Sequence, residues 1–246
     1  MARFFLEAGQ PNDGQIIITQ ADAHHITNVL RLQPGSDIEC VDERGLVHLV
    51  EITEVGDLVR GRVYDTQELS QESPLYLTLF QGLAKGDKMD LVIQKAVELG
   101  AMEIVPFTSR YTVVKLDSKQ AEKRKTRWER IALEAAKQSG RTVIPSIGEL
   151  CRFKDLISEV VKRKEQGELI LVAYEGENRT KMGDFGEKHE KISVLIGPEG
   201  GFSAEEIEKL VKIGCHTVSL GPRILRTETA GLVVLCLLGY KWGDLK

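Results

Sequence analysis

The chain has 246 residues, 42% of them hydrophobic and 28% charged, with a formal net charge of −4 at pH 7. This balance is typical of a folded globular protein of one or two domains, and it excludes collagen-like, low-complexity and disordered chains. The longest apolar run, Leu232–Leu238, is far shorter than the ~20 residues of a membrane span. Because Met1–Glu7 also lacks a signal-peptide pattern, we expect a cytoplasmic protein.

The first 73 residues are acidic and β-like. They carry 5 Lys and Arg against 13 Asp and Glu, a net charge of −8. One helical segment, 21–32, interrupts short runs that have the composition and turn signals of strands. The expected strands cover residues 15–19, 37–41, 46–53 and 58–64. We predict a small, mostly β barrel.

A polar stretch, Thr66–Pro74, closes this part of the chain. We therefore predict two domains, 1–72 and 73–246. Strands and helices alternate in the second, which predicts an α/β domain with a parallel sheet. The expected strands are 75–81, 103–108, 143–147, 168–174, 192–196 and 217–220, and the expected helices are 88–99, 117–139, 153–166, 204–213 and 227–240.

The cysteines show neither CxxC pairs nor the Cys/His spacing of zinc sites. They stand far apart, at Cys40, Cys151, Cys215 and Cys236. We expect buried, reduced thiols and no metal.

Two loops that follow expected strands carry the strongest functional signal. The first reads GPEGGFS over 197–203, and the second reads LGPRILRTETA over 220–230. Ligands of parallel sheets bind beyond the carboxyl ends of the strands, and glycines let a backbone approach a ligand closely. Ser203 and Glu206 form a capping box that specifies where the next helix starts. A third strand ends at Tyr174, before Glu175. We predict a ligand site in these loops.

Common nucleotide-binding motifs do not describe this site. Gly197, Gly200 and Gly201 miss the G-x-G-x-x-G spacing of dinucleotide-binding loops. The segment 82–88 lacks the spacing and the Ser or Thr of a phosphate-binding P-loop. Neither G-x-S-x-G nor HExxH is present. Hydrolase and phosphate chemistry are therefore poorly supported.

The two loops resemble those of the RsmE-type methyltransferases of the SPOUT superfamily. The resemblance extends over the whole chain, through HHITNVLR at 24–31, GLAKGDK at 82–88, IQKAVELG at 93–100 and QSGR at 138–141. Ala84 stands where the family usually has proline. The resemblance implies methylation of N3 of a specific uridine in 16S ribosomal RNA, with S-adenosyl-L-methionine as cofactor.

The same resemblance implies the architecture. We expect a PUA-like RNA-binding β barrel over 1–72 and a SPOUT methyltransferase domain with a trefoil knot over 73–246. It also implies a homodimer, with Leu232–Leu238 at or near the subunit interface. The residues expected to bind cofactor are Tyr174, Glu175, Ile196, Gly197, Pro198, Glu199, Gly200, Gly201, Leu220, Gly221, Ile224, Leu225, Arg226, Thr229 and Ala230.

The catalytic candidates are Arg226 and Glu228. Methylation at N3 removes a proton and spreads negative charge onto O2 and O4 of the base. Arg226 is suited to stabilise that charge or to hold a phosphate. Glu228 is suited to act as general base, to orient Arg226, or to stabilise the start of the helix. All three roles of Glu228 stay open at this point.

A basic face points to RNA contact. Residues 110–141 hold 10 Lys and Arg against 4 Asp and Glu, and helical spacing puts several of these bases opposite an apolar stripe around Trp128. A solvated charged face is the alternative interpretation. The expected RNA-binding residues are Lys123, Arg127, Arg130, Lys137 and Arg141 on this helix, Lys85, Lys88 and Arg110 nearby, and His25 and Arg31 in the first domain.

Two other classes of function stay open. One is a Rossmann-like enzyme with a nicotinamide cofactor, which the glycine spacing disfavours. The other is a non-catalytic RNA- or ribosome-binding module, which the two complete loops disfavour. Within the resembled superfamily, a methyltransferase with another target base is a further alternative.

Overall fold

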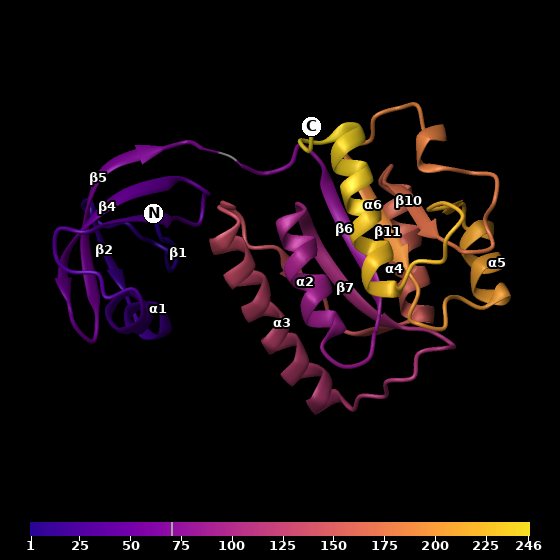
Figure 1. Ribbon diagram of the computed structural model, residues 1–246, viewed down its shortest axis with the longest axis horizontal. Coiled ribbons are helices and arrows are strands. Elements are labelled where there is room, and N and C mark those ends of the chain that lie inside the picture. The colour runs from indigo at the N-terminus through magenta and orange to yellow at the C-terminus, as the bar shows by residue number, and fades with distance from the viewer. Residues whose placement is uncertain (70) are drawn as a thin grey trace. The chain divides into compact units, whose positions relative to one another are not determined.

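The computed structural model describes residues 1–69 and 71–246, and they form two units (Figure 1). The first unit comprises Met1–Glu72 together with Ala136–Val143, and the second comprises Ser73–Ala135 and Ile144–Lys246. The grouping of 136–143 with the first unit was not expected from the sequence. Ser70, in the predicted boundary stretch, lies outside the described residues.

The first unit is a five-stranded sheet in the order β1-β3-β4-β5-β2. Its ladders are antiparallel except for β1 with β3. The strands surround an apolar core that includes Phe4, Ile38 and Val50. The predicted helix 21–32 is instead a short α-helix, α1 (Gln20–His24), followed by a π-helical turn, His25–Val29. The strands are β1 (Arg3–Phe5), β2 (Gln15–Ile18), β3 (Asp37–Val41), β4 (Val47–Val55) and β5 (Val59–Gln67).

Two of the predicted RNA-binding residues are structural parts of this unit. Arg141 is 4% exposed, and its Nε donates to Glu72 at 3.0 Å. Glu72 also accepts the backbone N–H of Thr142 at 2.9 Å. Lys137 donates to Asp22 at 2.6 Å, and its side chain is 10% exposed. Both cations therefore have carboxylate partners and little exposed surface, and their contact with RNA stays a prediction.

The second unit is a parallel sheet in the order β12-β10-β11-β6-β7-β8, with β9 also paired to β7. Every ladder in it is parallel. Its strands are β6 (Tyr76–Gly82), β7 (Ala101–Thr108), β8 (Ser146–Ile147), β9 (Cys151–Arg152), β10 (Leu169–Ala173), β11 (Lys191–Ile196) and β12 (His216–Val218). Its helices are α2 (Lys88–Glu98), α3 (Ser118–Gln138), α4 (Phe153–Glu165), α5 (Ala204–Lys212) and α6 (Thr227–Trp242).

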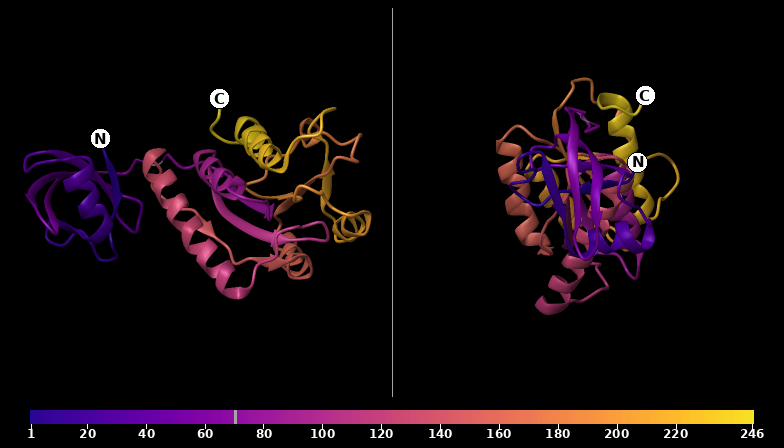
Figure 2. Two further views of the ribbon diagram at one scale, coloured as in Figure 1. Left: turned by 60° about the horizontal axis from the view of Figure 1, so that its bottom comes forward. Right: turned by 90° about the vertical axis from the view of Figure 1, so that its left-hand side faces the viewer.

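Helices cover both faces of this sheet, as its continuous apolar strands require. One apolar core joins Phe80, Val172 and Leu195 of the strands to residues of α4 and α5, among them Leu156 and Leu210. Helices α2 and α6 pack together on the sheet, and α3 runs beside α2 (Figure 1 and the left view of Figure 2). The predicted strand 143–147 is reduced to β8.

The strand register places the site. Ala173 of β10 lies opposite Ile196 of β11 and Val218 of β12, and Ile196 also lies opposite Gln81 of β6. Four strands therefore end level with one another, and the loops that leave them meet at one edge of the sheet. No helix among residues 1–69 and 71–246 is long and apolar enough to cross a membrane.

The thiols are only partly as predicted. Cys40 and Cys215 are buried, but Cys151 is half-buried and Cys236, on α6, is exposed. Burial raises the pKa of Cys40 to about 12 and that of Cys215 to about 11. These two thiols are therefore unreactive at neutral pH. The prediction of burial was wrong for Cys236, because α6 leaves one side uncovered.

Candidate active site

A cavity of about 430 Å³ lies at the carboxyl edge formed by β10, β11 and β12. Most of the predicted cofactor-binding residues line it; Gly200 and Thr229 do not. Its lining also includes residues that the sequence did not single out for cofactor binding. The predicted ones are Tyr174, Glu175, Ile196, Gly197, Pro198, Glu199, Gly201, Leu220, Gly221, Ile224, Leu225, Arg226 and Ala230, and the others are Lys88, Ala173, Asn178, Phe202, Ser219, Pro222, Arg223 and Thr227.

The loop after β11 is fixed at its far end by the predicted capping box. Ser203 Oγ accepts the N–H of Glu206, and the Glu206 carboxylate accepts the N–H of Ser203 at 2.9 Å. The same carboxylate accepts the N–H of Arg110 at 2.9 Å. Gly201 has a φ of +68°, a conformation that favours glycine. Gly200 faces Tyr111, where an added Cβ would lie 2.6 Å from the Tyr111 Cβ, so its role is in packing.

The start of α6 is tied to this loop. Thr227 Oγ1 donates to the carbonyl of Gly197 at 2.6 Å and accepts from Gln81 Nε2 at 2.8 Å. Both side chains are buried. These two hydrogen bonds join the ends of β6 and β11 to the helix that carries the second loop, so the two glycine-containing loops are held as one structure.

Lys88 lies between the two loops. Its Nζ is 3.2 Å from Glu199 Oε1 and 3.3 Å from Glu228 Oε2. Both carboxylates raise the pKa of Lys88. Burial alone would raise the pKa of Glu199, but hydrogen bonds from the Lys85 N–H and from Lys88 outweigh it, and the pKa lies below its ordinary value. Lys88 is thus a partly exposed cation of the cavity wall, paired with two carboxylates, and its predicted contact with RNA stays a prediction.

The two catalytic candidates differ in exposure. The Arg226 side chain is 82% exposed and that of Glu228 is 14% exposed, and Arg226 Nη1 is 4.0 Å from Glu228 Oε1. Glu228 lies in the first turn of α6, where the helix dipole stabilises a negative charge. The guanidinium at the mouth of the cavity is therefore free to meet a ligand, whereas the carboxylate beside it is held by Lys88.

Glu177 stabilises the third loop, which follows β10. Its carboxylate accepts from Thr217 Oγ1 at 2.6 Å and from the backbone N–H groups of Arg179 and Thr180 at 2.7 and 3.1 Å. These bonds lower the pKa of Glu177 from 4.5 to about 2. They fasten the segment that contains the cavity residue Asn178 to β12.

This contact predicts a pH dependence. The pKa of Glu177 is lower in the folded state, so its contribution to stability is fully present above pH 4.5 and is lost as the pH falls toward 2. We expect Glu177→Gln to lower the unfolding midpoint in urea at pH 6 and to make little difference near pH 2. Urea titrations of both proteins at each pH measure this. Equal destabilisation at both pH values would contradict the assignment.

The other predicted RNA-binding residues have different surroundings. On α3, Lys123, Arg127 and Arg130 are exposed, while Trp128 is buried. Arg127 Nε donates to Asp90 at 2.9 Å. Arg110 pairs with Glu205 at 2.8 Å. In the first unit, Arg31 is exposed, and His25 packs edge-on against Phe4 with ring centroids 6.2 Å apart. In the second unit, Lys85 is exposed.

Among the residues that the sequence did not assign to the cofactor, Lys88 and Thr227 do most to shape the cavity. Both follow loops that the sequence did identify, and both are the first residue of a helix. The partner of Lys88, Glu199, lies 111 residues away in the chain, and the partner of Thr227, Gly197, lies 30 residues away. A polar residue at a helix start beside a glycine loop was the available signal. Among the described residues, no cluster of His, Cys, Asp and Glu could hold a metal ion.

Comparison with known protein families gives two matches. Residues 71–239 match the model of an RNA methyltransferase domain, and residues 18–58 match that of an RNA methyltransferase PUA domain. The chain is 35% identical to the ribosomal RNA small subunit methyltransferase E of Bacillus subtilis, an alignment that covers 98% of this chain and 97% of that one.

Solved structures with the same fold include two with a bound ligand. The chain superposes on a ribosomal RNA small subunit methyltransferase E from Neisseria gonorrhoeae bound to S-adenosyl methionine, with a TM-score of 0.90, 32% identity and full coverage of both chains. It also superposes on the putative methyltransferase Lpg2936 from Legionella pneumophila in complex with the same cofactor, with a TM-score of 0.89, 32% identity and 99% coverage of both.

Proposed function

The chain belongs to the ribosomal RNA small subunit methyltransferase E family, and we propose that it methylates N3 of a specific uridine in 16S ribosomal RNA. S-adenosyl-L-methionine is the methyl donor in this proposal, as in the relatives whose structures contain it. The observation that carries the proposal is the cavity at the carboxyl edge of the sheet, whose walls are the two loops with the family's motifs.

The residues of the cavity fit this cofactor. Peptide groups of the loops that contain Gly197, Gly201 and Gly221 offer hydrogen bonds to the adenine and the carboxylate. Ile196 and Leu220 supply apolar surface, and Glu175 supplies a negative charge near a ligand that carries a sulfonium cation. The volume of about 430 Å³ lies in the range of small-molecule sites. When bound, the cofactor supplies an activated methyl group.

The chain's own residues then position the base and manage its charge. In this proposal the exposed Arg226 guanidinium binds an oxygen of the uracil and stabilises the negative charge that develops as the N3 proton leaves. Glu228 accepts that proton, and Lys88, 3.3 Å away, fixes the carboxylate. Closing of RNA over the cavity excludes water, which strengthens both interactions.

RNA contact is assigned to residues that remain exposed. Lys123 and Arg130 of α3 stand on the basic face, and Lys85 stands beside the cavity loop. Arg31 is the corresponding residue of the acidic first unit. It follows a π-helical turn, a feature that is frequent at functional sites.

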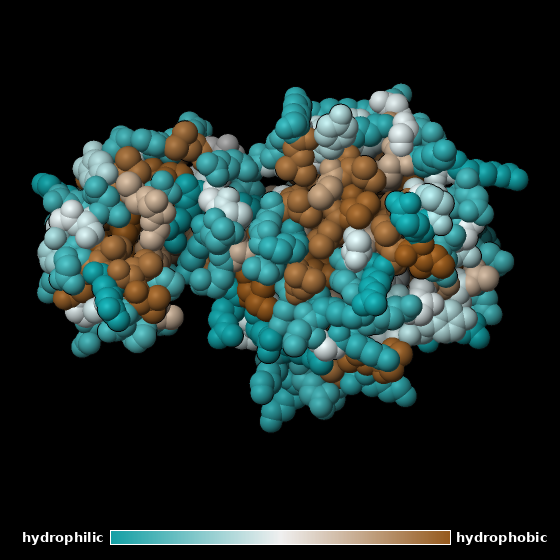
Figure 3. Space-filling model, in the orientation of Figure 1, coloured by the Kyte–Doolittle hydropathy of each residue, from teal (hydrophilic) through white to brown (hydrophobic). Residues whose placement is uncertain are grey.

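We assign the uncovered side of α6 to a homodimer. Leu237 and Tyr240 of α6 are 39% and 71% exposed, and Leu91 of the adjacent α2 is 44% exposed. Figure 3 shows hydrophobic residues gathered over these two helices. Sedimentation velocity tests this assignment, with the mass of two chains as the expected result. A trefoil knot in the second unit and a cytoplasmic location belong to the same proposal.

The decisive experiment is a methylation assay. The purified chain is incubated with the methyl donor and with small ribosomal subunits that lack the modification, and the digested RNA is analysed by nucleoside mass spectrometry. We expect N3-methyluridine only when donor and protein are both present. A different methylated nucleoside would leave the methyltransferase assignment intact and refute the uridine N3 target.

The same preparation separates the remaining alternatives. Binding of NADH in place of S-adenosyl-L-methionine would support a nicotinamide enzyme. Binding of RNA without any donor binding would support a non-catalytic module. The family match over 71–239 and the donor-bound relatives favour neither.

A further inference from the structure

A second cavity lies beside the proposed active site. Its volume is about 580 Å³, and the loop before α2, the segment 114–116 and the helix α3 form its walls. Gly86 and Asp87 line it, whereas the next residue, Lys88, lines the active-site cavity. The first turn of α2 therefore separates the two cavities. The full lining is Gly86, Asp87, Asp90, Val114, Lys115, Leu116, Gln120, Lys123, Arg124, Arg127 and Trp128.

The chemistry of this cavity is apolar surface with a cationic rim. Val114, Leu116 and Trp128 supply the apolar part. Arg127 is not a free cation, because Asp90 accepts from its Nε at 2.9 Å and Asp87 lies 3.9 Å from its Nη2. That ion-paired set forms one wall of the cavity, and its two aspartates pair with Arg127 and not with the remaining cations of the rim.

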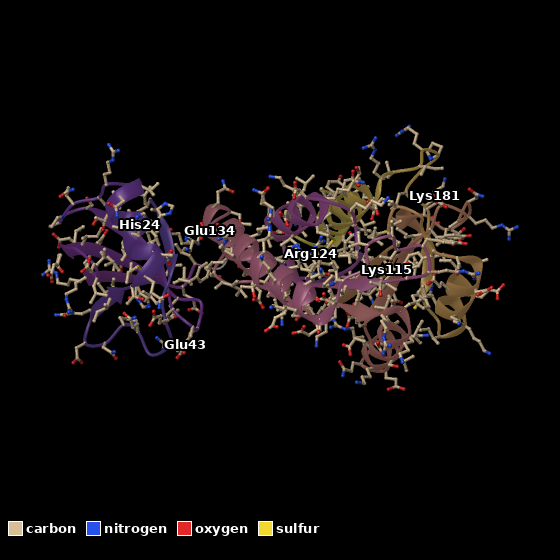
Figure 4. The ribbon with its side chains drawn as sticks, turned by 90° about the horizontal axis from the view of Figure 1, so that it is seen from below. His24, Glu43, Lys115, Arg124, Glu134 and Lys181 are labelled. Carbon is tan, nitrogen blue, oxygen red and sulfur yellow. The ribbon has the colours of Figure 1, made fainter. Side chains whose placement is uncertain are left out.

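Three cations remain: Lys115, Lys123 and Arg124. None of them forms an ion pair with a carboxylate of residues 1–69 or 71–246. Arg124 is half-buried and lines the cavity without an ion-pair partner among the described residues. An unpaired cation beside an apolar hollow favours an anionic ligand. Figure 4 shows Arg124 on α3 and Lys115 on the neighbouring segment, both on the face seen from below.

From these observations we propose that the cavity binds a nucleotide of the RNA strand next to the target uridine. The base occupies the apolar hollow of Val114, Leu116 and Trp128, and the phosphates bind Lys115, Lys123 and Arg124. Proteins commonly recognise single-stranded RNA by splaying bases into such pockets. This inference rests on the proposed function, because a strand whose target base enters the first cavity passes the turn of α2 that separates the two.

The test is a binding cycle between protein and RNA. Fluorescence anisotropy gives Kd for an RNA oligonucleotide that contains the target uridine and for shorter versions that lack the flanking nucleotides on either side. The variant is Lys115→Gln/Lys123→Gln/Arg124→Gln. Its matched control is Lys154→Gln/Lys162→Gln/Lys209→Gln, which removes the same charge from exposed positions of α4 and α5.

We expect the cavity variant to bind the full oligonucleotide about tenfold more weakly and to reduce the slope of log Kd against log salt by about 2, at ~0.7 per phosphate contact. The control changes Kd by less. Shortening the RNA on one side raises Kd for the wild type. The same shortening leaves Kd for the cavity variant unchanged, because that variant has already lost the subsite. An equal loss on shortening for both proteins, or equal effects of variant and control, overturns the proposal, as does a wild type that binds none of the RNAs.

Fluorescence gives a second readout. The chain has two tryptophans, and Trp242→Phe leaves Trp128 as the reporter of the cavity. We expect its emission to change when the full oligonucleotide is added and to stay constant with the shortened one. The mass-spectrometric assay distinguishes failure of the subsite from failure of the proposed function. Normal N3-methyluridine formation by the cavity variant with unchanged Kd refutes the subsite alone, whereas absence of methylation by the wild type refutes the proposed function.

Discussion

Replacement of Arg226 by alanine is expected to lower kcat about 10²- to 10³-fold, the usual loss when one donor to a developing oxyanion is removed. The side chain is 82% exposed and its folding contacts are few, so the unfolding midpoint should stay within about 2 °C. Single-turnover methylation measures the rate, and calorimetric titration measures binding of the methyl donor. Arg226→Lys should recover little, because a lysine is a point charge without the planar fork of arginine.

The partner variant divides the roles of the two residues. Glu228→Gln keeps the size of the side chain and a hydrogen-bond acceptor for Arg226, but it removes the proton acceptor. If Glu228 is the base, the methylation rate falls about 10²- to 10⁴-fold. The profile of that rate against pH then also differs from the wild-type profile. If Glu228 only orients Arg226, glutamine preserves most of the rate and the pH profile is unchanged. That second result would restrict the direct chemical role to Arg226.

Lys88 provides the control for both variants. It contacts Glu199 and Glu228 from α2, so Lys88→Met leaves both catalytic candidates, Arg226 and Glu228, present but releases Glu228. A loss of rate with unchanged donor affinity would be consistent with Lys88 as a positioning residue. A loss of donor affinity would indicate that Lys88 chiefly holds the 197–203 loop through Glu199.

Local signals in the sequence predict local structure well here. The capping box of Ser203 and Glu206 is present as expected, because its two members are three residues apart and need no distant partner. The parallel sheet follows from the alternation of apolar strands and helices. The positions of the two loops follow as well, since all strands of a parallel sheet end at the same edge.

Pairing across long sequence distances could not be predicted in this way. Helical periodicity grouped Lys137 with the other bases of α3, but it gave no sign that Asp22, 115 residues away, accepts from its ammonium group. The same holds for Arg141 and Glu72. A charged face shows which residues are neighbours on a helix, and only the fold shows which of them are covered.

Gly82→Ala is expected to weaken cofactor binding strongly through a single added methyl group. Gly82 ends β6, and a Cβ at this position would lie 2.3 Å from the Pro198 nitrogen and 2.6 Å from the Gly197 carbonyl carbon. Both are backbone atoms, so no side chain can rotate away to make room. The Gly197–Pro198 peptide must move, and it lines the active-site cavity.

Two consequences follow from this forced shift. Overpacking of a well-packed interior costs about 1–3 kcal/mol, which lowers the unfolding midpoint by about 2–10 °C. The displaced loop also loses its alignment for the donor, and we expect Kd for S-adenosyl-L-methionine to rise at least about tenfold, or about 1.4 kcal/mol. Gly186→Ala is the matched control, because an added Cβ there meets nothing within 4 Å. A Gly82→Ala protein with normal donor affinity would show that the loop can retreat without opening the site, and the rigid coupling of β6 to the cavity would have to be abandoned.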